Sequence, residues 1–319
     1  MSWKILVNDG MEEEGVQALQ AFGFEVDCNS ISQDLLKTAL PSFDGIIVRS
    51  ATKLRKELID SCPNLKFIAR GGVGMDNIDV DYARSKNIQV INTPAASSRS
   101  VAELAMAHIL SCTRGLFISS RDLKDSDSFV KLKKQMSSFQ EVKAKKLFLI
   151  GFGRIGKELS KMALGAEMEV IVHDPYIKIA EIELDIMGTM FNVNLPLVDL
   201  DEGLQQADYI SIHTPFSGNP ILTKREFGLM KKNVILINTS RGENIDESAL
   251  IQALESGIVQ AAGLDVFQNE PNISPIILKQ RNIGVTPHIG ASTKEAQARI
   301  AIELADKIKD CYNKNQVTQ

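Results

Sequence analysis

Residues 146–174, KLFLIGFGRIGKELSKMALGAEMEVIVHD, decide the fold expected for this chain. An apolar run of strand character, KLFLI, leads into a glycine-rich turn, and a segment with helical spacing follows before a second apolar run, EVIVHD. A strand, a turn, a helix and a further strand in this order form a crossover unit of a parallel sheet. The stretch therefore predicts an α/β domain built on a doubly wound parallel sheet.

Three glycines in the turn, Gly151, Gly153 and Gly156, have the GxGxxG spacing of a dinucleotide-binding loop. The first permits a tight turn, the second lets backbone approach a pyrophosphate, and the third lets the helix pack on the strand. The helix N-terminus adds partial positive charge. On its own, this pattern also fits a turn that only connects a strand to a helix.

Asp174 lies at the end of the next predicted strand, about 20 residues after the glycines. A carboxylate there accepts hydrogen bonds from ribose hydroxyls and repels a 2′-phosphate. Spacing and strand context together predict NAD rather than NADP as the cofactor. Asp174 alone would equally suit a surface position before Pro175, and we interpret its neighbour His173 as a structural or exposed histidine.

Apolar runs recur on both sides of this unit. In the first hundred residues they lie near 4–7, 24–27, 46–48, 67–69 and 88–91, with helical segments such as 12–22 and 53–62 between them. A second series consists of KLFLI, MEVIV, TMFNV, DYISI, NVILI, AAGLDV and NIGVT. Strand-then-helix alternation predicts two parallel sheets, the second with seven strands.

Two long helices are predicted between and after these series. Ser100 with Glu103 resembles a capping box that opens a helix over 101–118, and Ser292 with Glu295 resembles one that opens a helix over 294–312. The first series is short of a final helix, so we expect the C-terminal helix to return to the N-terminal domain. This predicts a discontinuous substrate-binding domain of residues 1–98 and 292–319, a Rossmann NAD-binding domain of residues 99–291, and a cleft between them.

The composition is that of a globular protein. Of 319 residues, 44% are hydrophobic and 24% charged, and at roughly 150 residues per domain this length predicts two domains. A formal net charge of −4 and a pI near 5.7 give no general basic surface. We therefore expect a small-molecule partner and no nucleic acid.

Other function classes lack their sequence signals. The four cysteines are scattered without CxxC spacing, so no metal site or thioredoxin-like motif is expected. The N-terminus, MSWKILVNDG, does not resemble a signal peptide, and no apolar stretch approaches about 18 residues. We expect a cytoplasmic protein with no membrane segment.

Three charged residues follow predicted strands of the second series: Arg241 after VILINTS, Glu270 after AAGLDVFQN, and His288 after NIGVTP. Doubly wound sheets bind ligands beyond the C-terminal ends of their strands, so these three side chains can converge. Taken singly, each residue also fits a role without catalysis: Arg241 in a salt bridge at a helix end, Glu270 as a solvated loop carboxylate, and His288 as a hydrogen-bonded loop histidine. Their common position behind a dinucleotide fingerprint favours a catalytic set.

The three side chains offer complementary chemistry for oxidising a secondary alcohol. Histidine suits proton exchange near neutral pH, so His288 is the expected acid/base. A carboxylate beside it would favour its protonated form and fix its orientation, which is the role expected of Glu270. Arg241 offers a planar fork that suits the carboxylate of a 2-oxo acid and polarises the adjacent carbonyl.

The sequence resembles the D-isomer-specific 2-hydroxyacid dehydrogenases over nearly its entire length. The matching motifs, in the expected order, are IGFGRIG, VILINTSRGENIDESAL, AAGLDVFQNEP and TPHIGAST. The resemblance implies Arg241, Glu270 and His288 as the catalytic residues, and a homodimer formed through the Ser100 helix and residues 121–146. It implies cofactor contacts, beyond the glycines, from Arg154, Ile155, Asp174, Thr214, Thr239, Ser240, Asp265, Gly290 and Ala291.

In the N-terminal domain, VRSATK (48–53) and ARGGVGMDNIDV (69–80) look most like 3-phosphoglycerate dehydrogenases. Arg49 and Arg70 each end an apolar strand, and two guanidinium groups suit a dianionic phosphate. An interdomain salt bridge is the alternative for both. The glycine turn after Arg70 would offer backbone amides to the substrate carboxylate, so the expected substrate-binding residues are Arg49, Ser50, Arg70, Gly71, Gly72 and Val73.

We therefore expect NAD-dependent oxidation of D-3-phosphoglycerate to 3-phosphohydroxypyruvate, the entry step of serine biosynthesis. A glyoxylate or hydroxypyruvate reductase is the main alternative, and Arg49 and Arg70 distinguish the two. An NAD-responsive corepressor-like binding protein is a remote alternative, since it would bind NADH without efficient turnover. The sequence ends at Gln319, which would leave no room for the regulatory domain that many phosphoglycerate dehydrogenases carry, so no serine inhibition through such a domain is expected.

Overall fold

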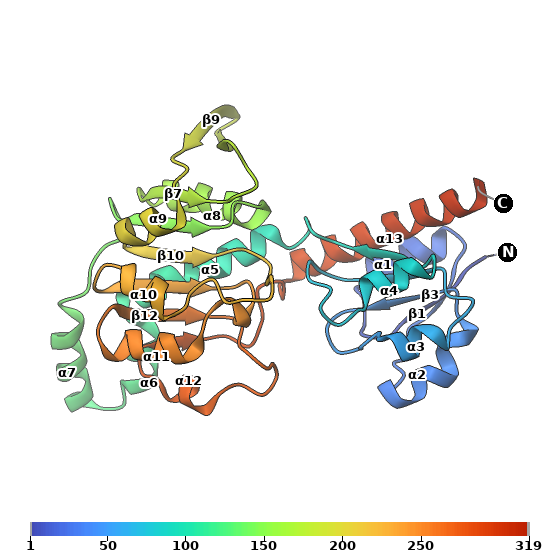
Figure 1. Cartoon of the computed structure of the whole chain (residues 1–319), viewed down its shortest axis with the longest axis horizontal. Coiled ribbons are helices and arrows are strands. Elements are labelled where there is room, and N and C mark those ends of the chain that lie inside the picture. The colour runs from blue at the N-terminus through green and yellow to red at the C-terminus, as the bar shows by residue number, and fades with distance from the viewer. Residues whose placement is uncertain (1, 318–319) are drawn as a thin grey trace. The chain divides into compact units, whose positions relative to one another are not determined.

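The structure, a computed structural model, describes residues 2–317, with side chains described up to Asn315. The chain divides into two compact units. Unit 1 comprises Met1–Ser97 and Ala291–Gln319, and unit 2 comprises Ser98–Gly290. Each is an α/β unit built on its own parallel sheet (Figure 1), as the sequence predicts.

Unit 1 contains a five-stranded parallel sheet with the order β2-β1-β3-β4-β5. Its strands are β1 (Lys4–Val7), β2 (Glu25–Asp27), β3 (Gly45–Val48), β4 (Phe67–Arg70) and β5 (Gln89–Asn92). The helices are α1 (Glu13–Ala21), α2 (Gln33–Ala39), α3 (Lys56–Asp60), α4 (Val80–Ser85) and α13 (Lys294–Val317), with a short 3-10 turn, η1 (Leu40–Ser42). This is the flavodoxin-like order of a doubly wound sheet.

Alternation along β1 explains why both faces of this sheet are covered. Leu6 joins a cluster with Leu36 of α2 on one face, whereas Ile5 joins a cluster with Leu19 of α1 and Leu304 of α13 on the other. The side chains of a strand point to opposite faces in turn, so a continuous apolar run needs helices on both sides. The C-terminal helix α13 supplies one of these helices and packs beside α1.

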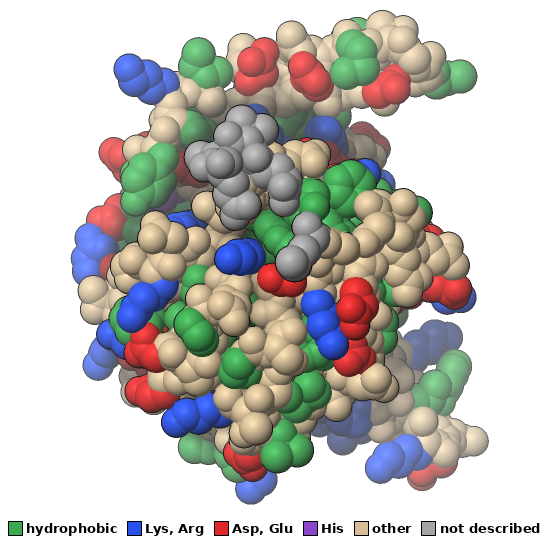
Figure 2. Space-filling view, turned by 90° about the vertical axis from the view of Figure 1, so that its right-hand side faces the viewer, with side chains coloured by type: hydrophobic (Ala, Val, Ile, Leu, Met, Phe, Trp, Pro, Cys, Tyr) green, Lys and Arg blue, Asp and Glu red, His purple; other side chains and the backbone are tan. Residues whose placement is uncertain are grey.

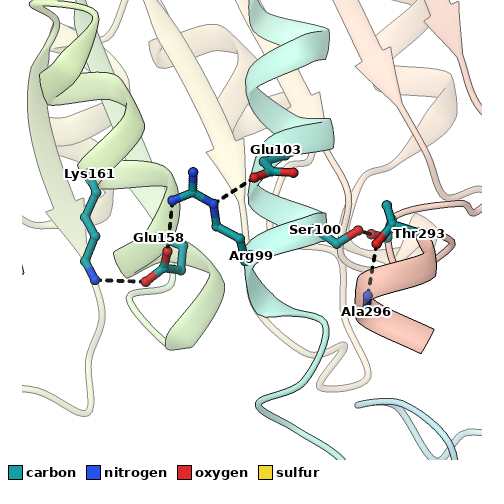
Figure 3. Close-up of polar contacts among 8 residues, drawn as sticks. Arg99, Ser100, Glu103, Glu158, Lys161, Thr293 and Ala296 are labelled. Atoms are coloured by element: carbon teal, nitrogen blue, oxygen red, sulfur yellow. Dashed lines mark hydrogen bonds and ion pairs between the residues drawn. The ribbon is translucent and has the colours of Figure 1, made fainter. Parts of the chain in front are cut away.

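Helix α13 starts where the sequence predicts, but with another capping residue. The hydroxyl Oγ1 of Thr293 accepts a hydrogen bond from the amide of Ala296 at 3.2 Å (Figure 3). The predicted capping residue, Ser292, is therefore wrong by one position. The helix also extends to Val317, beyond the predicted end at residue 312.

Unit 2 contains a six-stranded parallel sheet with the order β13-β12-β11-β10-β6-β7. Its strands are β6 (Lys146–Ile150), β7 (Glu169–His173), β10 (Tyr209–Ile212), β11 (Val234–Asn238), β12 (Val259–Leu264) and β13 (Ile283–Val285). The helices are α5 (Ser98–Arg114), α6 (Leu116–Asp122), α7 (Ser126–Met136), α8 (Arg154–Gly165), α9 (Leu200–Gln206), α10 (Lys224–Leu229), α11 (Glu247–Glu255) and α12 (Pro275–Lys279), with a 3-10 turn, η2 (Gly242–Asn244). The strand order reverses between β6 and β10, which creates the switch point where such sheets bind ligands.

The run TMFNV was predicted as a strand of this sheet, and that prediction is wrong. It lies in β9 (Thr189–Leu195), which pairs with β8 (Ala180–Ile186) in a separate antiparallel hairpin. Met187 and Gly188 both have positive φ, +52° and +84°, as a two-residue hairpin turn of the favoured hand requires. The strand β7 is the edge of the sheet, and beside it the described residues form an isolated parallel bridge between Val172 and Leu197 in place of a further strand.

The hairpin is half anchored and half exposed. Near its base, Ala180, Ile182 and Leu195 are buried in the core of unit 2. Toward the turn, Ile186 and Phe191 continue the same apolar face but are exposed, and hydrophobic side chains are visible on the arm at the top of Figure 2. The hairpin therefore depends on its base for stability, because an isolated two-stranded ribbon is marginal in water.

Helix α5 also differs from the prediction, which placed one helix over 101–118 with Ser100 as its cap. Ser100 lies inside α5 and its hydroxyl donates to the carbonyl of Gly290 at 2.7 Å. The helix ends before Gly115, whose φ of +61° and close approach to Phe139 require glycine. A bend of 65° separates α5 from α6 there.

Charged side chains tie α5 to α8. Arg99 of α5 pairs with Glu103 one turn further on and also reaches Glu158 of α8, which in turn pairs with Lys161 (Figure 3). The predicted capping partner Glu103 thus forms a surface ion pair instead. Among the described residues, no single helix has the length and apolar composition to cross a membrane; α5 and α6 meet that test only when taken together across their bend.

Candidate active site

The glycine loop after β6 has the tight geometry that the sequence predicts. Gly151 has φ of +95°, and a Cβ there would lie 2.8 Å from the carbonyl oxygen of His213 and from Cγ2 of Thr214. A Cβ on Gly156 would lie 2.6 Å from the carbonyl oxygen of Gly151, whereas a Cβ on Gly153 would meet nothing within 4 Å. The loop is therefore close-packed at its first and third glycines and open at the second, where a ligand can approach.

Helix α8 begins directly after this loop, with Gly153 as its N-cap and Arg154 and Ile155 in its first turn. The amides of a helix's first turn have no partner within the helix, and the helix dipole places partial positive charge there. No acidic residue occupies this first turn. The N-terminus of α8 can therefore receive an anionic group such as a pyrophosphate.

Asp174 follows β7 and is fixed by two backbone amides. Its Oδ2 accepts from the amide of Phe152 and its Oδ1 from the amide of Tyr176, both at 2.9 Å. The amide of Phe152 belongs to the glycine loop, so the carboxylate of Asp174 is bound directly to that loop. The remaining lone pairs are available to hydroxyl donors.

The loops after β10 and β11 are joined by Asn244. Its Nδ2 donates to the carbonyl of Thr214 at 3.0 Å and to Oγ of Ser240 at 3.1 Å. Within the described residues, Oδ1 of Asn244, Oγ1 of Thr239 and Nδ1 of His213 are buried without a hydrogen-bond partner. Buried polar atoms normally have partners, so these atoms suit a ligand or ordered water.

His213 combines a structural contact with a strongly shifted pKa. Its Nε2 lies 2.8 Å from Oγ of Ser211, and burial lowers the pKa of His213 to about 4. The ring is therefore neutral at physiological pH.

Arg241 lies just after β11 in a turn that Asn238 organises. Oδ1 of Asn238 accepts from the amide and the hydroxyl of Ser240, and its Nδ2 donates to the carbonyl of Arg241 at 2.8 Å. The guanidinium of Arg241 donates Nη1 to the carbonyl of Ser240 at 2.7 Å. Asn238 is almost fully buried, so the turn that presents Arg241 has a rigid base.

Glu270 and His288 form a direct pair. Oε2 of Glu270 lies 2.7 Å from Nδ1 of His288, and Oε1 accepts from the amide of Phe267 at 2.9 Å. Burial acts to raise the pKa of Glu270, but the bonds from His288 and Phe267 and the charge of Arg241 outweigh it, so this pKa is lowered. Nδ1 of His288 is thus engaged, and Nε2 is the nitrogen left for a proton transfer.

The backbone around His288 is held by Asp265, at the end of β12. His288 has φ of +52°, and its amide donates to the carbonyl of Asp265 at 2.9 Å. The carboxylate of Asp265 accepts from the amides of Ile289 and Gly290, each at 2.9 Å. Gly290 is the last residue of unit 2, so the predicted contact residue Ala291 belongs to unit 1.

In unit 1, Arg49 and Arg70 lie at the ends of neighbouring strands. Val48 pairs with Arg70 in the β3–β4 register, and Arg49 follows immediately, with Ser50 exposed beyond it. The amide of Arg49 donates to Oδ2 of Asp9 at 2.7 Å. Both guanidinium groups are therefore carried by the carboxyl edge of one sheet.

The glycine turn after Arg70 offers fewer free amides than the sequence suggests. The amide of Gly71 donates to the carbonyl of Val48 at 2.9 Å, and that of Gly72 donates to Oγ1 of Thr93 at 2.8 Å. A Cβ on Gly72, whose φ is +137°, would collide with the guanidinium of Arg70. Gly71 and Gly72 thus shape the turn. The amides available to a substrate are those of Val73 and Gly74.

Several organising residues escaped the sequence analysis. In unit 1, Asp9 accepts from the amides of Arg49 and Thr52, and Asn77 donates to the carbonyls of the same two residues. Asp9 follows an apolar strand, a position that could have drawn attention to it. Asn77, like Asn244 of unit 2, acts on a segment that the sequence does not reveal as its neighbour.

The family model for the NAD-binding domain of D-isomer-specific 2-hydroxyacid dehydrogenases matches residues 106–290. A hydroxypyruvate reductase of Thermotoga maritima is 42% identical over 312 residues, which cover 96% of this chain and 97% of the relative. A D-3-phosphoglycerate dehydrogenase of Methanocaldococcus jannaschii is 38% identical over 96% of this chain but 57% of its own length. The crystal structure of the TT0316 protein from Thermus thermophilus superposes with a TM-score of 0.83 at 27% identity, covering 97% of both chains.

The chain belongs to the D-isomer-specific 2-hydroxyacid dehydrogenase family, and its unit 2 is an NAD-binding domain. The site's own geometry fits that cofactor. The space beside Gly153 is open, the first turn of α8 is free of acidic side chains, and Thr239 and Asn244 carry buried atoms without partners in the described structure. The D-3-phosphoglycerate dehydrogenase of Methanocaldococcus jannaschii is longer, and this chain spans a little over half of it.

Proposed function

We propose that the chain oxidises D-3-phosphoglycerate to 3-phosphohydroxypyruvate, and reduces the product in the reverse direction. The observation that carries the reaction type is the 2.7 Å contact between Nδ1 of His288 and Oε2 of Glu270 in an NAD-binding unit. NAD, when bound, accepts or returns the hydride at C2 of the substrate. All remaining chemistry is assigned to side chains.

His288 is the proposed acid/base. Its Nε2 takes the hydroxyl proton in oxidation and returns a proton to the carbonyl oxygen in reduction, while Nδ1 stays bonded to Glu270. Glu270, whose pKa is lowered, stays ionised and stabilises the charge that develops on the imidazole. Arg241 grips the substrate carboxylate and polarises the oxygen at C2.

The cofactor is assigned to the loops at the switch point. The N-terminus of α8, with Gly151, Gly153, Arg154, Ile155 and Gly156, would hold the pyrophosphate. Asp174 would hold the ribose hydroxyls and disfavour a 2′-phosphate. The remaining proposed contacts are Thr214, Thr239, Ser240, Asp265, Gly290 and Ala291.

The phosphate is assigned to unit 1. Arg49 and Arg70 lie at the ends of the adjacent strands β3 and β4. Two guanidinium groups suit a dianionic phosphate better than a neutral hydroxymethyl group. Ser50, Val73 and the turn formed by Gly71 and Gly72 complete the proposed substrate residues.

The test compares 3-phosphohydroxypyruvate with hydroxypyruvate as substrates for NADH oxidation. We expect kcat/KM to favour the phosphorylated acid, and Arg49→Ala to lower kcat/KM at least about tenfold for that substrate alone, since charge-assisted hydrogen bonds contribute about 1.5–3 kcal/mol. Arg55→Ala is the matched control, because Arg55 pairs with Asp79 on the same unit. Equal losses for both substrates, or a preference for hydroxypyruvate, would reject the phosphate assignment.

A hydroxypyruvate reductase is the second candidate function. The similarity to the Thermotoga maritima hydroxypyruvate reductase, 42% identity over nearly the full length of both chains, favours it. Cofactor and catalytic residues would be the same in both enzymes. The two proposals differ in what Arg49 contributes, so the substrate comparison decides between them.

We also propose a homodimer through α5, α6 and the rest of the segment up to residue 146. Leu116, Leu123, Phe129 and Val130 are large apolar side chains that are more than half exposed along this segment, and apolar patches of this kind mark interfaces. Light scattering should give twice the chain mass of 35.1 kDa. Replacing Phe129 and Val130 by Glu should yield the monomer, whereas Met187→Glu at the hairpin turn should not; a monomeric wild type would reject the proposal.

A further inference from the structure

His108 is a buried histidine of α5 that has no place in the site described so far. Its ring lies against Gly263 of β12, where a Cβ would approach the Cβ, Cγ and Nδ1 atoms of His108 to 2.7–2.8 Å. The glycine in AAGLD thus makes room for an imidazole two residues before Asp265. The exposed fraction of His108 is 6%, so a protonated nitrogen of its ring needs an acceptor within the protein.

A chain of hydrogen bonds runs from this ring to the loop of His288. Nε2 of His108 lies 3.0 Å from Oγ1 of Thr286, and Oγ1 of Thr286 lies 2.6 Å from Oδ1 of Asp265. Asp265 in turn holds the amides of Ile289 and Gly290. The chain therefore ends on the residues that directly follow His288.

The direction of these bonds follows from the donors available. The hydroxyl of Thr286 donates its single proton to Oδ1 of Asp265. Oγ1 of Thr286 must then accept from Nε2 of His108, which requires the imidazole to carry a proton on Nε2. Burial lowers the pKa of His108, although Asp265 opposes that effect, so the ring is neutral, with Nδ1 unprotonated.

We propose that His108 is a positioning residue for the proton transfer at His288, acting through Thr286 and Asp265. This inference rests on the proposed role of His288 as acid/base. His288 sits in a left-handed backbone conformation, φ +52°, which a non-glycine residue keeps only when its surroundings impose it. The amide of His288 bonds to the carbonyls of Asp265 and Thr286, so the orientation of those two residues sets that of His288.

A matched pair of variants separates positioning from packing. His108→Gln keeps a nitrogen donor as many bonds from Cα as Nε2 of histidine, whereas His108→Asn is one bond too short to reach Thr286. We expect the Gln variant to keep kcat within about twofold and the Asn variant to lose about fivefold or more, the loss typical of one hydrogen bond, at unchanged KM for NADH. Equal kcat values for the two variants would overturn the proposal.

A second measurement needs no turnover, and so separates failure of this inference from failure of the proposed function. The chain has four histidines, few enough for long-range ¹H–¹⁵N spectra to resolve each ring. We expect the His108 signals to report a neutral ring protonated on Nε2 near pH 7, and Gly263→Ala or Thr286→Val to remove that slowly exchanging proton. A ring protonated on Nδ1 alone, or one that is charged at pH 7, would contradict the hydrogen-bond chain.

Discussion

Replacing Glu270 by Gln tests the pair at the centre of the proposed mechanism. Gln keeps an oxygen that can accept from Nδ1 of His288, but it removes the negative charge that faces the imidazole at 2.7 Å. A hydrogen bond to a charged group contributes about 1.5–3 kcal/mol and a neutral one about 0.5–1.5 kcal/mol. The side chains are 33% and 48% exposed, so solvent weakens the difference to about 1 kcal/mol.

A loss of about 1 kcal/mol in the transition state corresponds to a kcat about fivefold lower. Steady-state NADH oxidation with saturating 2-oxo acid measures it. Glu247→Gln is the matched control, because Glu247 accepts from the amide of Gln268 on the same loop without reaching His288. If Glu270→Gln and Glu247→Gln both retained the wild-type kcat, the carboxylate would have no role in stabilising the imidazolium, and the reasoning would be refuted.

Three further changes have expected outcomes. Asp174→Asn should lower the preference for NAD over NADP about tenfold or more, since it removes the charge that repels a 2′-phosphate; an unchanged KM ratio would contradict this. Gly151→Ala should weaken NADH binding in a fluorescence titration, because its φ of +95° and its 2.8 Å approach to His213 leave no room for a Cβ; Gly165→Ala, where a Cβ meets nothing within 4 Å, should have no effect. The free energy of unfolding should fall as pH drops from about 6.5 toward 4, because His213 is neutral in the folded state with a pKa of about 4, whereas the same histidine in the unfolded chain takes up a proton near pH 6.5. Urea titrations should show a loss of about 2–3 kcal/mol by pH 4, and this loss should be smaller in His213→Gln. An equal pH dependence of the free energy of unfolding in the wild type and in His213→Gln would refute this prediction.

Most of the architecture could be predicted because parallel strands buried on both faces form continuous apolar runs. KILV, KLFLI and VILIN are such runs, and each is a strand in the structure. The family could be predicted because its motifs combine glycine spacing with charged residues at strand ends. These signals are local in sequence, so they need no knowledge of which segments become neighbours.

The prediction failed where an apolar run had a second interpretation. Apolar and polar residues alternate in FNVNL (191–195), which overlaps this run, and together with AEIELDI and the intervening Met187–Gly188 turn this gives the pattern of an antiparallel hairpin. Taken alone, the run resembled the other strands. Ser100 was misread for a similar reason, because its spacing from Glu103 fits a capping box but its hydroxyl bonds to Gly290, 190 residues away in sequence.

The residues of the candidate site also fall into those that the sequence predicts and those that it does not. Arg241, Glu270 and His288 could be selected from their positions after strands, and the structure brings Glu270 and His288 into contact. Asn244 and the chain from His108 to Asp265 could not be selected, because each links segments that lie far apart in the sequence. Such contacts depend on the packed sheet, which no spacing in the sequence reports.

The most direct test of the central claim is the turnover of His288→Asn. Asn tolerates the left-handed backbone at this position, so the variant should fold and bind NADH with a Kd within about threefold of wild type. The account predicts that its kcat for 2-oxo acid reduction falls by about 10²–10⁴-fold, the contribution typical of a general acid. A variant that binds NADH and retains the wild-type kcat would remove His288 from the mechanism.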